Sequence, residues 1–162
     1  MSSAVPEGEE RAVSALERAT TVPDLLRDAC VALVELLDAR ACAISRVLGD
    51  VLVTLTEHAP AGETLQLGQG YLITDFPLTV EVIELGESRI ASLLDGESDR
   101  REAELLEALG FDTLLMVPLL VAGQCWALVE VYRRDGPPFT LEDAGLAEHL
   151  VGRAGELVER LS

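Results

Sequence analysis

The segment spanning residues 113–132 constrains the fold more than any other part of this sequence. It reads TLLMVPLLVAGQCWALVEVY and carries no charged side chain before Glu130, although 25% of the residues in the chain are charged. A membrane-spanning helix needs about 20 uninterrupted apolar residues. The uncharged run, which ends at Val129, is shorter, and it contains Pro118 and Gly123, which break helices. We therefore predict two strands, at residues 113–121 and 124–132.

The pair Ala122-Gly123 separates the two predicted strands. Glycine at the second position of a short loop supplies the positive φ that a tight hairpin requires. Pro118 removes one ladder hydrogen bond, so we expect an edge, a bulge or a kink near it. Each strand is apolar on both faces, which predicts that both sides of the sheet are covered. Glu130 shares its face with Trp126, Leu128 and Tyr132 because strand side chains alternate. Since Glu130 is acidic, we expect this face of the sheet to be more solvated than the other.

The rest of the chain alternates helical and extended patterns. Thr21 and Thr140 are predicted helix caps, Thr140 together with Asp143 in a capping box, and Asp99 with Glu102 resembles another. These patterns predict a flexible N-terminus at residues 1–9 and a single domain at residues 10–162. The domain is expected to be an α+β or α/β sandwich with a sheet of about six strands and helices on both faces. Helices are predicted at residues 10–18, 20–39, 77–85, 100–109 and 140–161, and further strands at 41–47, 51–57, 63–73 and 88–94.

Charge and cysteine content limit the classes of partner and location. The formal net charge of −17 would repel a phosphate backbone and an anionic membrane surface, so neither nucleic acid nor membrane is an expected partner. Cys30, Cys42 and Cys125 are widely spaced and lack metal-site or disulfide spacing, which predicts reduced, buried thiols in a cytoplasmic protein and no metal. The N-terminal residues are acidic and lack the apolar run of a signal peptide.

Three stretches of the sequence resemble a GAF domain. They are DFPLTVEVIELGE (residues 75–87), ELLEALGFDTLLMVPLLVAGQCWALVEVY (104–132) and PPFTLEDAGLAEHLVGRAGELVERL (137–161), and the resemblance extends over residues 22–161. Its most specific part is residues 109–132, although Ala127 stands where GAF hairpins often have glycine. The resemblance implies a central antiparallel sheet with helices from both chain ends on one face. On the other face, it implies a segment between the third and fifth strands that folds over a pocket.

The resemblance also implies a regulatory function. GAF domains sense small molecules, dimerise through their terminal helices and control output domains, so we expect a homodimer that acts on an output protein in trans, unless the chain is part of a longer protein. The alternative is a GAF fold that serves only for dimerisation or protein docking, without a ligand. An enzyme is not expected, because no nucleophile–base pair, phosphate loop or carboxylate pair stands out.

The candidate pocket combines the covering segment with the predicted hairpin. Tyr71, Asp75 and Thr79 are polar groups of the kind that orient a ligand, but Asp75 could instead cap the helix that begins near Pro77, and Tyr71 could be a core residue. Glu130 could equally be a partly exposed strand residue. The full set of candidates for the pocket is Tyr71, Asp75, Phe76, Thr79, Ile83, Thr113, Leu115, Trp126, Leu128 and Glu130. The candidates for the dimer interface are Leu16, Leu25, Gly152, Leu157 and Leu161.

No cofactor is expected, because the ligands of known GAF classes fit the sequence poorly. Phe139 and Asp143 match part of the cyclic-nucleotide signature, but Ala144 replaces its glutamate, and the chain has neither asparagine nor lysine. No cysteine is followed by histidine, as bilin attachment usually requires. His58 and His149 lie outside the predicted pocket, which argues against haem. The absence of cysteine between residues 55 and 118 argues against a reductase of free methionine sulfoxide.

Overall fold

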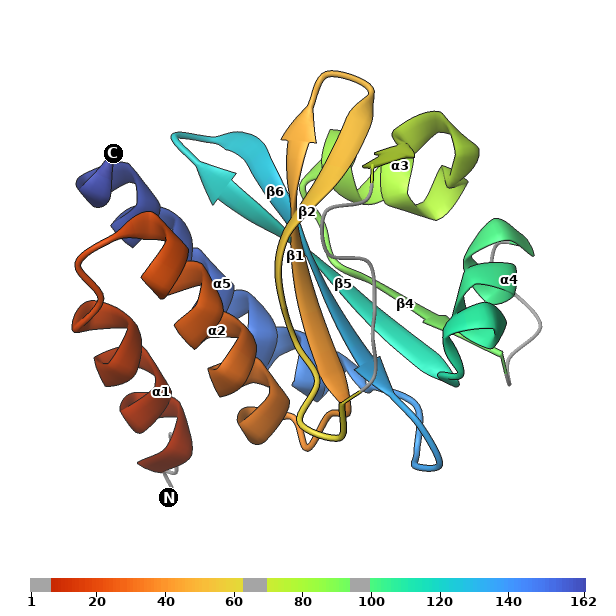
Figure 1. The fold of residues 1–162 in the computed structure, drawn as a ribbon, viewed down its shortest axis with the longest axis horizontal. Coiled ribbons are helices and arrows are strands. Elements are labelled where there is room, and N and C mark those ends of the chain that lie inside the picture. Colours follow the sequence, from red (N-terminus) through yellow and green to blue (C-terminus); the bar gives the residue numbers. More distant parts are fainter. Residues whose placement is uncertain (1–6, 63–69, 94–99) are drawn as a thin grey trace.

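A six-stranded sheet forms the centre of the computed structural model, which describes residues 7–62, 70–93 and 100–162. All neighbouring strands are antiparallel, and they lie in the order β3-β2-β1-β6-β5-β4. The strands from the two halves of the chain therefore meet at the β1–β6 pair (Figure 1). The strands are β1 (Ala41–Leu48), β2 (Val51–His58), β3 (Gly70–Leu72), β4 (Arg89–Ser92), β5 (Thr113–Val121) and β6 (Gln124–Arg133).

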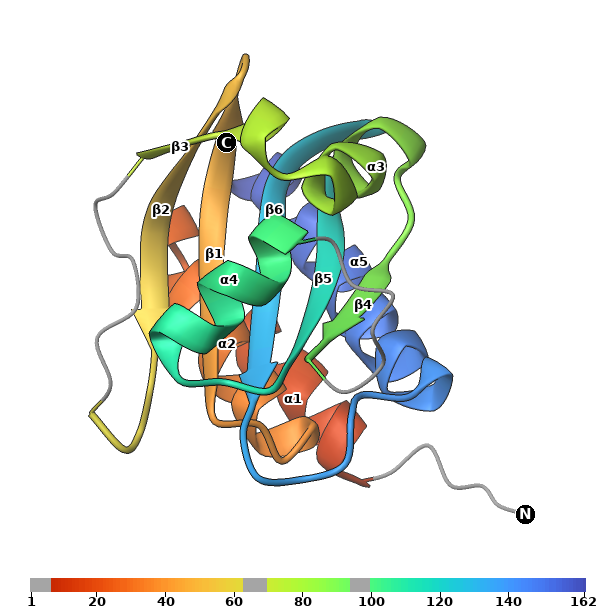
Figure 2. The same cartoon turned by 90° about the vertical axis from the view of Figure 1, so that its right-hand side faces the viewer.

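Helices cover both faces of this sheet (Figures 1 and 2). One face carries α2 (Val22–Leu36) and α5 (Leu141–Leu161), and α1 (Glu7–Glu17) packs outside them against both helices. The other face carries the short helix η1 (Ile73–Asp75), α3 (Pro77–Leu85) and α4 (Arg100–Leu109). The predicted α+β architecture, with terminal helices on one face and a covering segment on the other, is confirmed.

The central hairpin forms as predicted. Ala122 and Gly123 adopt φ values of 52° and 80°, which is the pair of positive angles typical of a two-residue turn that matches strand twist. Pro118 is buried and faces Leu128 in the ladder, and the register shifts between Leu119 and Leu120, one residue further on. The bulge expected near Pro118 is therefore present.

The two faces of the hairpin belong to two separate apolar clusters. Odd-numbered residues of β5 and β6, such as Val117 and Val129, pack against α2 and α5. Even-numbered residues, such as Met116 and Leu128, pack under α3 and α4. This two-sided burial explains why both strands are apolar throughout.

Local signals at the helix ends agree with the predictions. The Thr21 hydroxyl accepts a hydrogen bond from the Asp24 amide (3.2 Å). Thr140 and Asp143 form both bonds of a capping box, at 3.1 and 2.9 Å. The α1 helix begins at Glu7, inside the segment predicted to be flexible. The predicted cap at residues 99–102 and the first part of the predicted third strand, residues 63–69, lie outside the described residues.

The predicted dimer interface is largely wrong. Leu16, Leu25 and Leu157 are 0%, 0% and 4% exposed, respectively, because they pack in the cluster between the terminal helices and the sheet. These leucines are core residues and cannot contact another subunit. Gly152 is exposed, and Leu161 is partly exposed.

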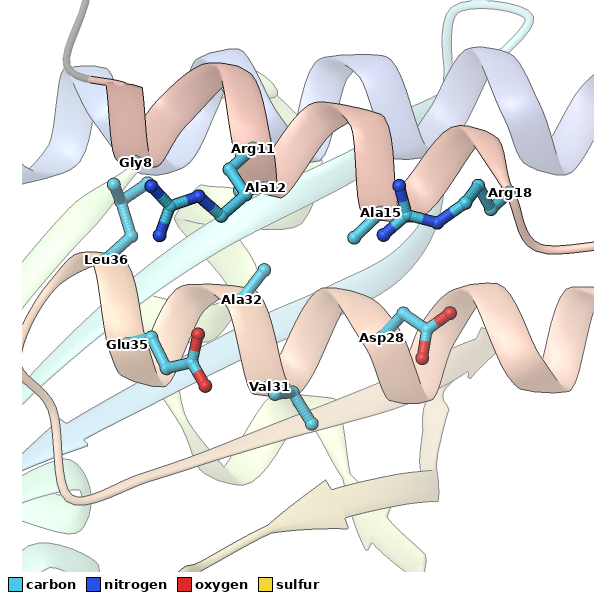
Figure 3. Close-up of a pocket in the computed structure, with 10 residues that line it drawn as sticks. All are labelled: Gly8, Arg11, Ala12, Ala15, Arg18, Asp28, Val31, Ala32, Glu35 and Leu36. Carbon is cyan, nitrogen blue, oxygen red and sulfur yellow. The ribbon is translucent and has the colours of Figure 1, made fainter.

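A groove separates α1 from α2 on the side away from α5. Its volume is about 530 Å³, and its walls combine small apolar side chains with charged ones (Figure 3). The two helices run in opposite directions along it (Figures 1 and 3).

Candidate functional site

The sheet face under α3 brings together half of the predicted pocket residues. Tyr71 comes from β3, Thr79 and Ile83 from α3, and Leu128 and Glu130 from β6. All five are buried or half-buried, and three of them, Tyr71, Ile83 and Leu128, pack in or against one apolar cluster. Segments that are distant in the sequence thus meet on one surface, as the covering-segment prediction requires.

Glu130 lies near the middle of this face and is only 5% exposed. It faces Ala43 on β1 and Met116 on β5, so strands flank it on both sides. The Tyr132 hydroxyl donates a hydrogen bond to its Oε2 at 3.2 Å. Burying a carboxylate is costly unless it is hydrogen-bonded, so an apolar residue would serve a purely structural face better. Glu130 is therefore the strongest candidate for a ligand-binding side chain on this surface.

Tyr71 is placed at the β3 edge of the same face. Burial raises the pKa of its phenol, and the negative charges of Glu130 and Glu57 raise that pKa further. Its ring meets Phe76 edge to face, with centroids 6.1 Å apart and an interplanar angle of 74°. Tyr71 and Phe76 thus form an aromatic wall beside the buried acid.

The α3 helix is fixed over β5 by residues on its inner side. Pro77 occupies the first turn, where its missing N–H is harmless. Gly86 ends the helix with φ 67°, a left-handed conformation that favours glycine. Thr79 is buried and contacts the Met116 sulfur through its hydroxyl at 3.6 Å. The helix therefore holds one hydroxyl close to the strand position opposite Glu130.

The end of this face under α4 is closed by packing. The rings of Phe111 and Tyr132 lie 5.0 Å apart and are tilted by 30°. Leu106 of α4 and Leu114 of β5 are both 0% exposed. The polar groups of Tyr71, Thr79 and Glu130 thus lie between the middle of the face and its end near α3 and β3.

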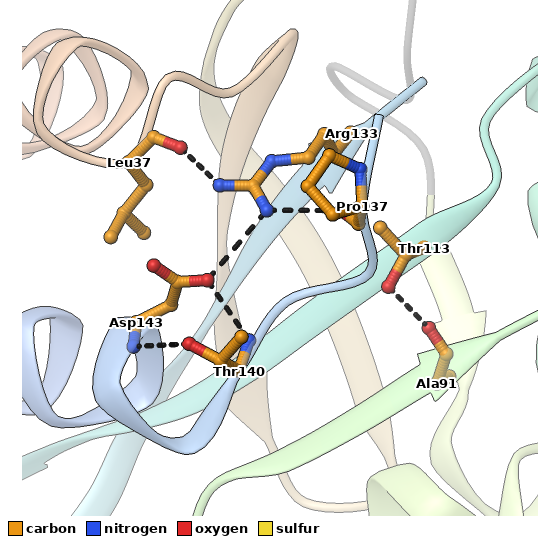
Figure 4. Close-up of polar contacts among 7 residues, drawn as sticks. All are labelled: Leu37, Ala91, Thr113, Arg133, Pro137, Thr140 and Asp143. Carbon is orange, nitrogen blue, oxygen red and sulfur yellow. Dashed lines mark hydrogen bonds and ion pairs between the residues drawn. The ribbon is translucent and has the colours of Figure 1, made fainter. Parts of the chain in front are cut away.

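The structure places three predicted strand residues elsewhere. Leu115 packs in the cluster under the terminal helices, so its assignment to the pocket face is wrong. Thr113, two residues earlier, shares that orientation; it is buried, and its hydroxyl donates to the Ala91 carbonyl at 3.0 Å (Figure 4). Trp126 packs against the helix-side cluster at the bulge, with the Arg46 guanidinium 4.5 Å from its ring centroid.

Asp75 is a further residue that the sequence wrongly assigned to the pocket. It lies in η1 and is exposed, so it does not join the buried polar groups. It does not cap α3 either, since Phe76 holds that position and no side chain bonds the first turn. Both sequence interpretations of Asp75 are therefore wrong.

Two residues of this face were not among the pocket candidates, although Tyr132 was expected on the same face as Glu130. Tyr132 donates to Glu130, and Met116 contacts Thr79. The turn alone does not reveal Met116, because Val121 faces Gln124 beside the turn, and only the register shift between Leu119 and Leu120 brings Met116 opposite Glu130.

Arginines line a second cavity, of about 470 Å³, at the connection from β6 to α5. Arg133 hydrogen-bonds the carbonyls of Leu37 and Pro137 and lies 3.6 Å from the Asp143 carboxylate (Figure 4). Its guanidinium also stacks on Phe139, 4.2 Å from the ring centroid. This arginine fastens α2 and α5 to the sheet, so we assign it a structural role.

The cysteines have the environment of inert thiols. Cys30 and Cys42 are both 0% exposed, and burial followed by a hydrogen bond with Cys30 raises the pKa of Cys42 well above its ordinary value. Burial raises the pKa of the half-buried Cys125 to about 11. At pH 8, only about 0.1% of such a thiol is the reactive thiolate.

We therefore expect a chromogenic disulfide reagent at pH 8 to leave Cys30 and Cys42 of the folded protein unmodified and to react slowly with Cys125. Unfolding in guanidinium should make all three react at the rate of a free thiol, which gives the control. Rapid labelling of Cys125 in the folded protein would contradict this assignment.

The described residues also bear on membrane insertion and metal binding. None of the helices in the described ranges is long and apolar enough to cross a membrane. The same residues contain no group of three or more His, Cys, Asp or Glu side chains arranged to hold a metal ion.

Comparisons with solved structures find the same fold in phytochromes. The chromophore-binding domain of a Stigmatella aurantiaca bacteriophytochrome matches with a TM-score of 0.80 and 18% identity, over 96% of this chain and 61% of that one. A bacteriophytochrome domain from R. palustris matches with a TM-score of 0.81 and 12% identity, over 96% and 60%. This chain thus spans about three fifths of those two domains.

A far-red-absorbing protein solved with bound biliverdin matches along almost its whole length. The TM-score is 0.80 and the identity is 12%, over 95% of this chain and 98% of that one. At these identities the likeness establishes the fold alone. No curated protein matches the sequence.

The family itself is shown by the sequence. The family model of the GAF domain matches residues 21–157, which is most of the chain and includes the central hairpin, the covering helices and most of the last helix. Together with the order of strands and the placement of the helices, this match shows that the chain belongs to the GAF domain family.

Proposed function

We propose that this chain is a sensory GAF domain that binds a small molecule beside Glu130, on the sheet face that α3 covers. The observation that carries the proposal is the buried carboxylate of Glu130 among Tyr71, Thr79 and Tyr132. Small-molecule sites are mostly apolar surfaces with a few polar groups that orient the ligand. The described residues of this face have that composition.

The chemistry of these groups defines a class of ligand. A buried carboxylate accepts hydrogen bonds, and a charged donor gives it the strongest ones. The net charge of −17 also favours cations over anions. We therefore propose a ligand that presents an amine, a guanidinium or a ring N–H to Glu130.

Structural relatives support the use of this fold for ligands. The far-red-absorbing relative holds biliverdin, and the phytochrome relatives are chromophore-binding domains. We propose that the present chain uses the sheet face under α3 for a different ligand, because no cysteine here is followed by histidine. The proposal also includes a role in regulation and not in catalysis, a cytoplasmic location, a homodimer and an output protein in trans. Membership of the GAF family supports these parts of the proposal.

The first experiment is native mass spectrometry of the purified protein, followed by denaturation and identification of any released compound. Thermal denaturation with a panel of amines, amino acids and purines should then reveal a ligand that raises the melting temperature. Glu130→Gln keeps the size of the side chain but removes the charge, and we expect it to weaken binding at least about tenfold, since hydrogen bonds to charged groups are worth about 1.5–3 kcal/mol.

The matched control is Glu142→Gln, which makes the same change at an exposed position of the first turn of α5. It should leave binding unchanged. If the protein carries no compound and no member of the panel stabilises it, the sensory proposal loses its support.

A specific observation favours a second function, that of a docking module without a ligand. Phe111, Leu114, Leu106 and Tyr132 fill the end of the face under α4 with fully buried side chains. If packing rather than binding shaped the whole face, Glu130→Leu should raise the melting temperature, because a buried acid would be replaced by an apolar side chain of similar size.

A further inference from the structure

We propose that Tyr132 positions the Glu130 carboxylate and links the charge of this acid to the turn between α4 and β5. The Tyr132 hydroxyl donates to Glu130 Oε2 at 3.2 Å, and the two residues are 0% and 5% exposed. Both belong to β6 and are two positions apart, so their side chains lie on the same face of the sheet. The inference deepens the proposed function and rests on it for the ligand that Glu130 receives.

The ring of Tyr132 packs against the turn that ends α4. Phe111 in this turn is 1% exposed, and its ring centroid lies 5.0 Å from that of Tyr132, with a tilt of 30°. The Phe111 amide donates to the Leu106 carbonyl at 2.9 Å, which fixes the turn to the last part of α4. Phe111 therefore limits where the Tyr132 hydroxyl can lie.

Arg134 holds the same turn. Its Nε donates to the Gly110 carbonyl, and its guanidinium lies 5.2 Å from the centroid of the Phe111 ring. Gly110 ends α4 with φ 80°, a left-handed conformation. Contacts thus run without a break from Glu130 through Tyr132 and Phe111 to the turn, and Arg134 fastens their far end.

A second acid gives the Tyr132 hydrogen bond a specific effect on charge. Glu57 on β2 and Glu130 on β6 both lie opposite Ala43, so both carboxylates belong to one face. Their Cα atoms are two strand spacings apart, roughly 9.5 Å. Like charges at a shared site favour protonation of one acid, whereas a hydrogen bond donated to a carboxylate favours its charged form. Tyr132 therefore makes Glu130 the acid that stays ionised, which is the state that an amine ligand requires.

The other titratable groups that act on Glu130 from the described residues of neighbouring strands are Glu57, Tyr71 and Cys42. Burial is the main cause that raises the pKa of Tyr71 and the pKa of Cys42 above their ordinary values. Both groups are therefore neutral at pH 7. Among these three, Glu57 is the one that can oppose the charge of Glu130.

Ligand binding at Glu130 changes the same hydrogen bond. A bound cation shares the carboxylate with the Tyr132 hydroxyl, so the bond to Tyr132 weakens or shifts. Tyr132 and Phe111 are almost completely buried, and close-packed side chains pass on small displacements because no void absorbs them. The displacement reaches the turn at the end of α4, one of the helices on this face (Figure 2). Occupation of the site is thereby transmitted to α4.

The test is a pH titration by nuclear magnetic resonance, without added ligand, of protein carrying ¹³C at the glutamate δ carbons and ¹⁵N at the amides. In the wild type, part of the shift change of the Gly110 and Phe111 amides should follow the titration of Glu130. Glu130→Gln assigns the δ-carbon signal and should remove that part. Asp112 and Glu107, which lie beside the turn, titrate in both proteins, so the difference isolates Glu130.

Tyr132→Phe keeps the ring contact with Phe111 but removes the hydroxyl. We expect it to raise the pKa of Glu130 by about 1, because the charged form loses a hydrogen bond. It should also reduce the part of the amide shifts that follows Glu130 to less than half. A role in packing alone would leave both quantities unchanged. Phe111→Leu is the second variant; it keeps the hydroxyl and should remove the Glu130-dependent shift of the Gly110 amide.

Tyr71→Phe is the matched control, because it removes the hydroxyl of the other tyrosine of the chain, which interacts with Glu130 through charge. It should leave the amide response intact. Circular dichroism should show that every variant is folded. An unchanged pKa of Glu130 in Tyr132→Phe overturns the positioning role, and amides that do not follow Glu130 in the wild type overturn the link to α4. Neither result depends on a ligand, so the absence of a bound compound would count against the proposed function alone.

Discussion

Gly155→Ala is expected to lower the free energy of unfolding by up to about 2 kcal/mol, although alanine favours helix over glycine by about 1 kcal/mol. A Cβ atom at Gly155 would lie 2.2 Å from the Leu120 carbonyl oxygen and 3.3 Å from its carbon. The obstacle is backbone at the β5 bulge, so no side-chain rotation relieves it. Overpacking of this kind typically costs 1–3 kcal/mol, about enough to outweigh the gain in helix propensity.

Gly152→Ala is the matched control in the same helix. Nothing lies within 4 Å of a Cβ atom at Gly152, which is exposed. The same substitution should therefore raise the free energy of unfolding by up to about 1 kcal/mol. Urea denaturation of the two variants measures both changes. Equal effects at the two positions would mean that α5 does not pack on β5 as closely as described.

These two glycines show where sequence reasoning succeeds and fails. The sequence assigned Gly152 to a subunit contact. The structure gives Gly155 the close contact, and that contact is to a strand of the same chain. Helical periodicity identifies an apolar side of α5 but not its partner, because a strand and a second helix demand the same small residues.

The same limit explains the misplaced interface leucines. Leu16, Leu25 and Leu157 follow the apolar stripes of their helices, and a stripe facing a subunit has the same sequence pattern as one facing the core. The sequence likewise shows equal spacing of Arg11 and Arg18 on α1 and of Asp28 and Glu35 on α2, but the juxtaposition of these pairs depends on how α1 folds back along α2.

The hairpin was predictable in outline and not in register. Turn chemistry at Ala122-Gly123 located both strands correctly. Assigning Leu115 and Glu130 to one face required knowing which residues face each other, and that depends on loop length and on the bulge after Leu119. Glu130 was nevertheless identified from sequence, because a single acid in an apolar run stands out in any register.

Arg133→Met is expected to lower the free energy of unfolding by about 2–3 kcal/mol. The Arg133 side chain is 12% exposed and holds the Leu37 and Pro137 carbonyls while it stacks on Phe139. Each lost hydrogen bond costs about 1 kcal/mol, and the cation–π contact adds about 1 kcal/mol. Methionine fills similar space, so the loss reports the guanidinium contacts and not a cavity. In a domain of this size the melting temperature should fall by roughly 5–10 °C.

Arg133→Lys distinguishes the shape of the guanidinium from its charge. Lysine keeps the positive charge near Asp143, 3.6 Å away in the wild type, but it cannot reach two carbonyls and a ring face with one planar group. We therefore expect Arg133→Lys to recover less than half of the stability that Arg133→Met loses. If Arg133→Lys were as stable as the wild type, the positive charge alone would hold α5 in place. The junction between α2, β6 and α5 would then depend on the ion pair with Asp143 and not on the hydrogen bonds to the two carbonyls.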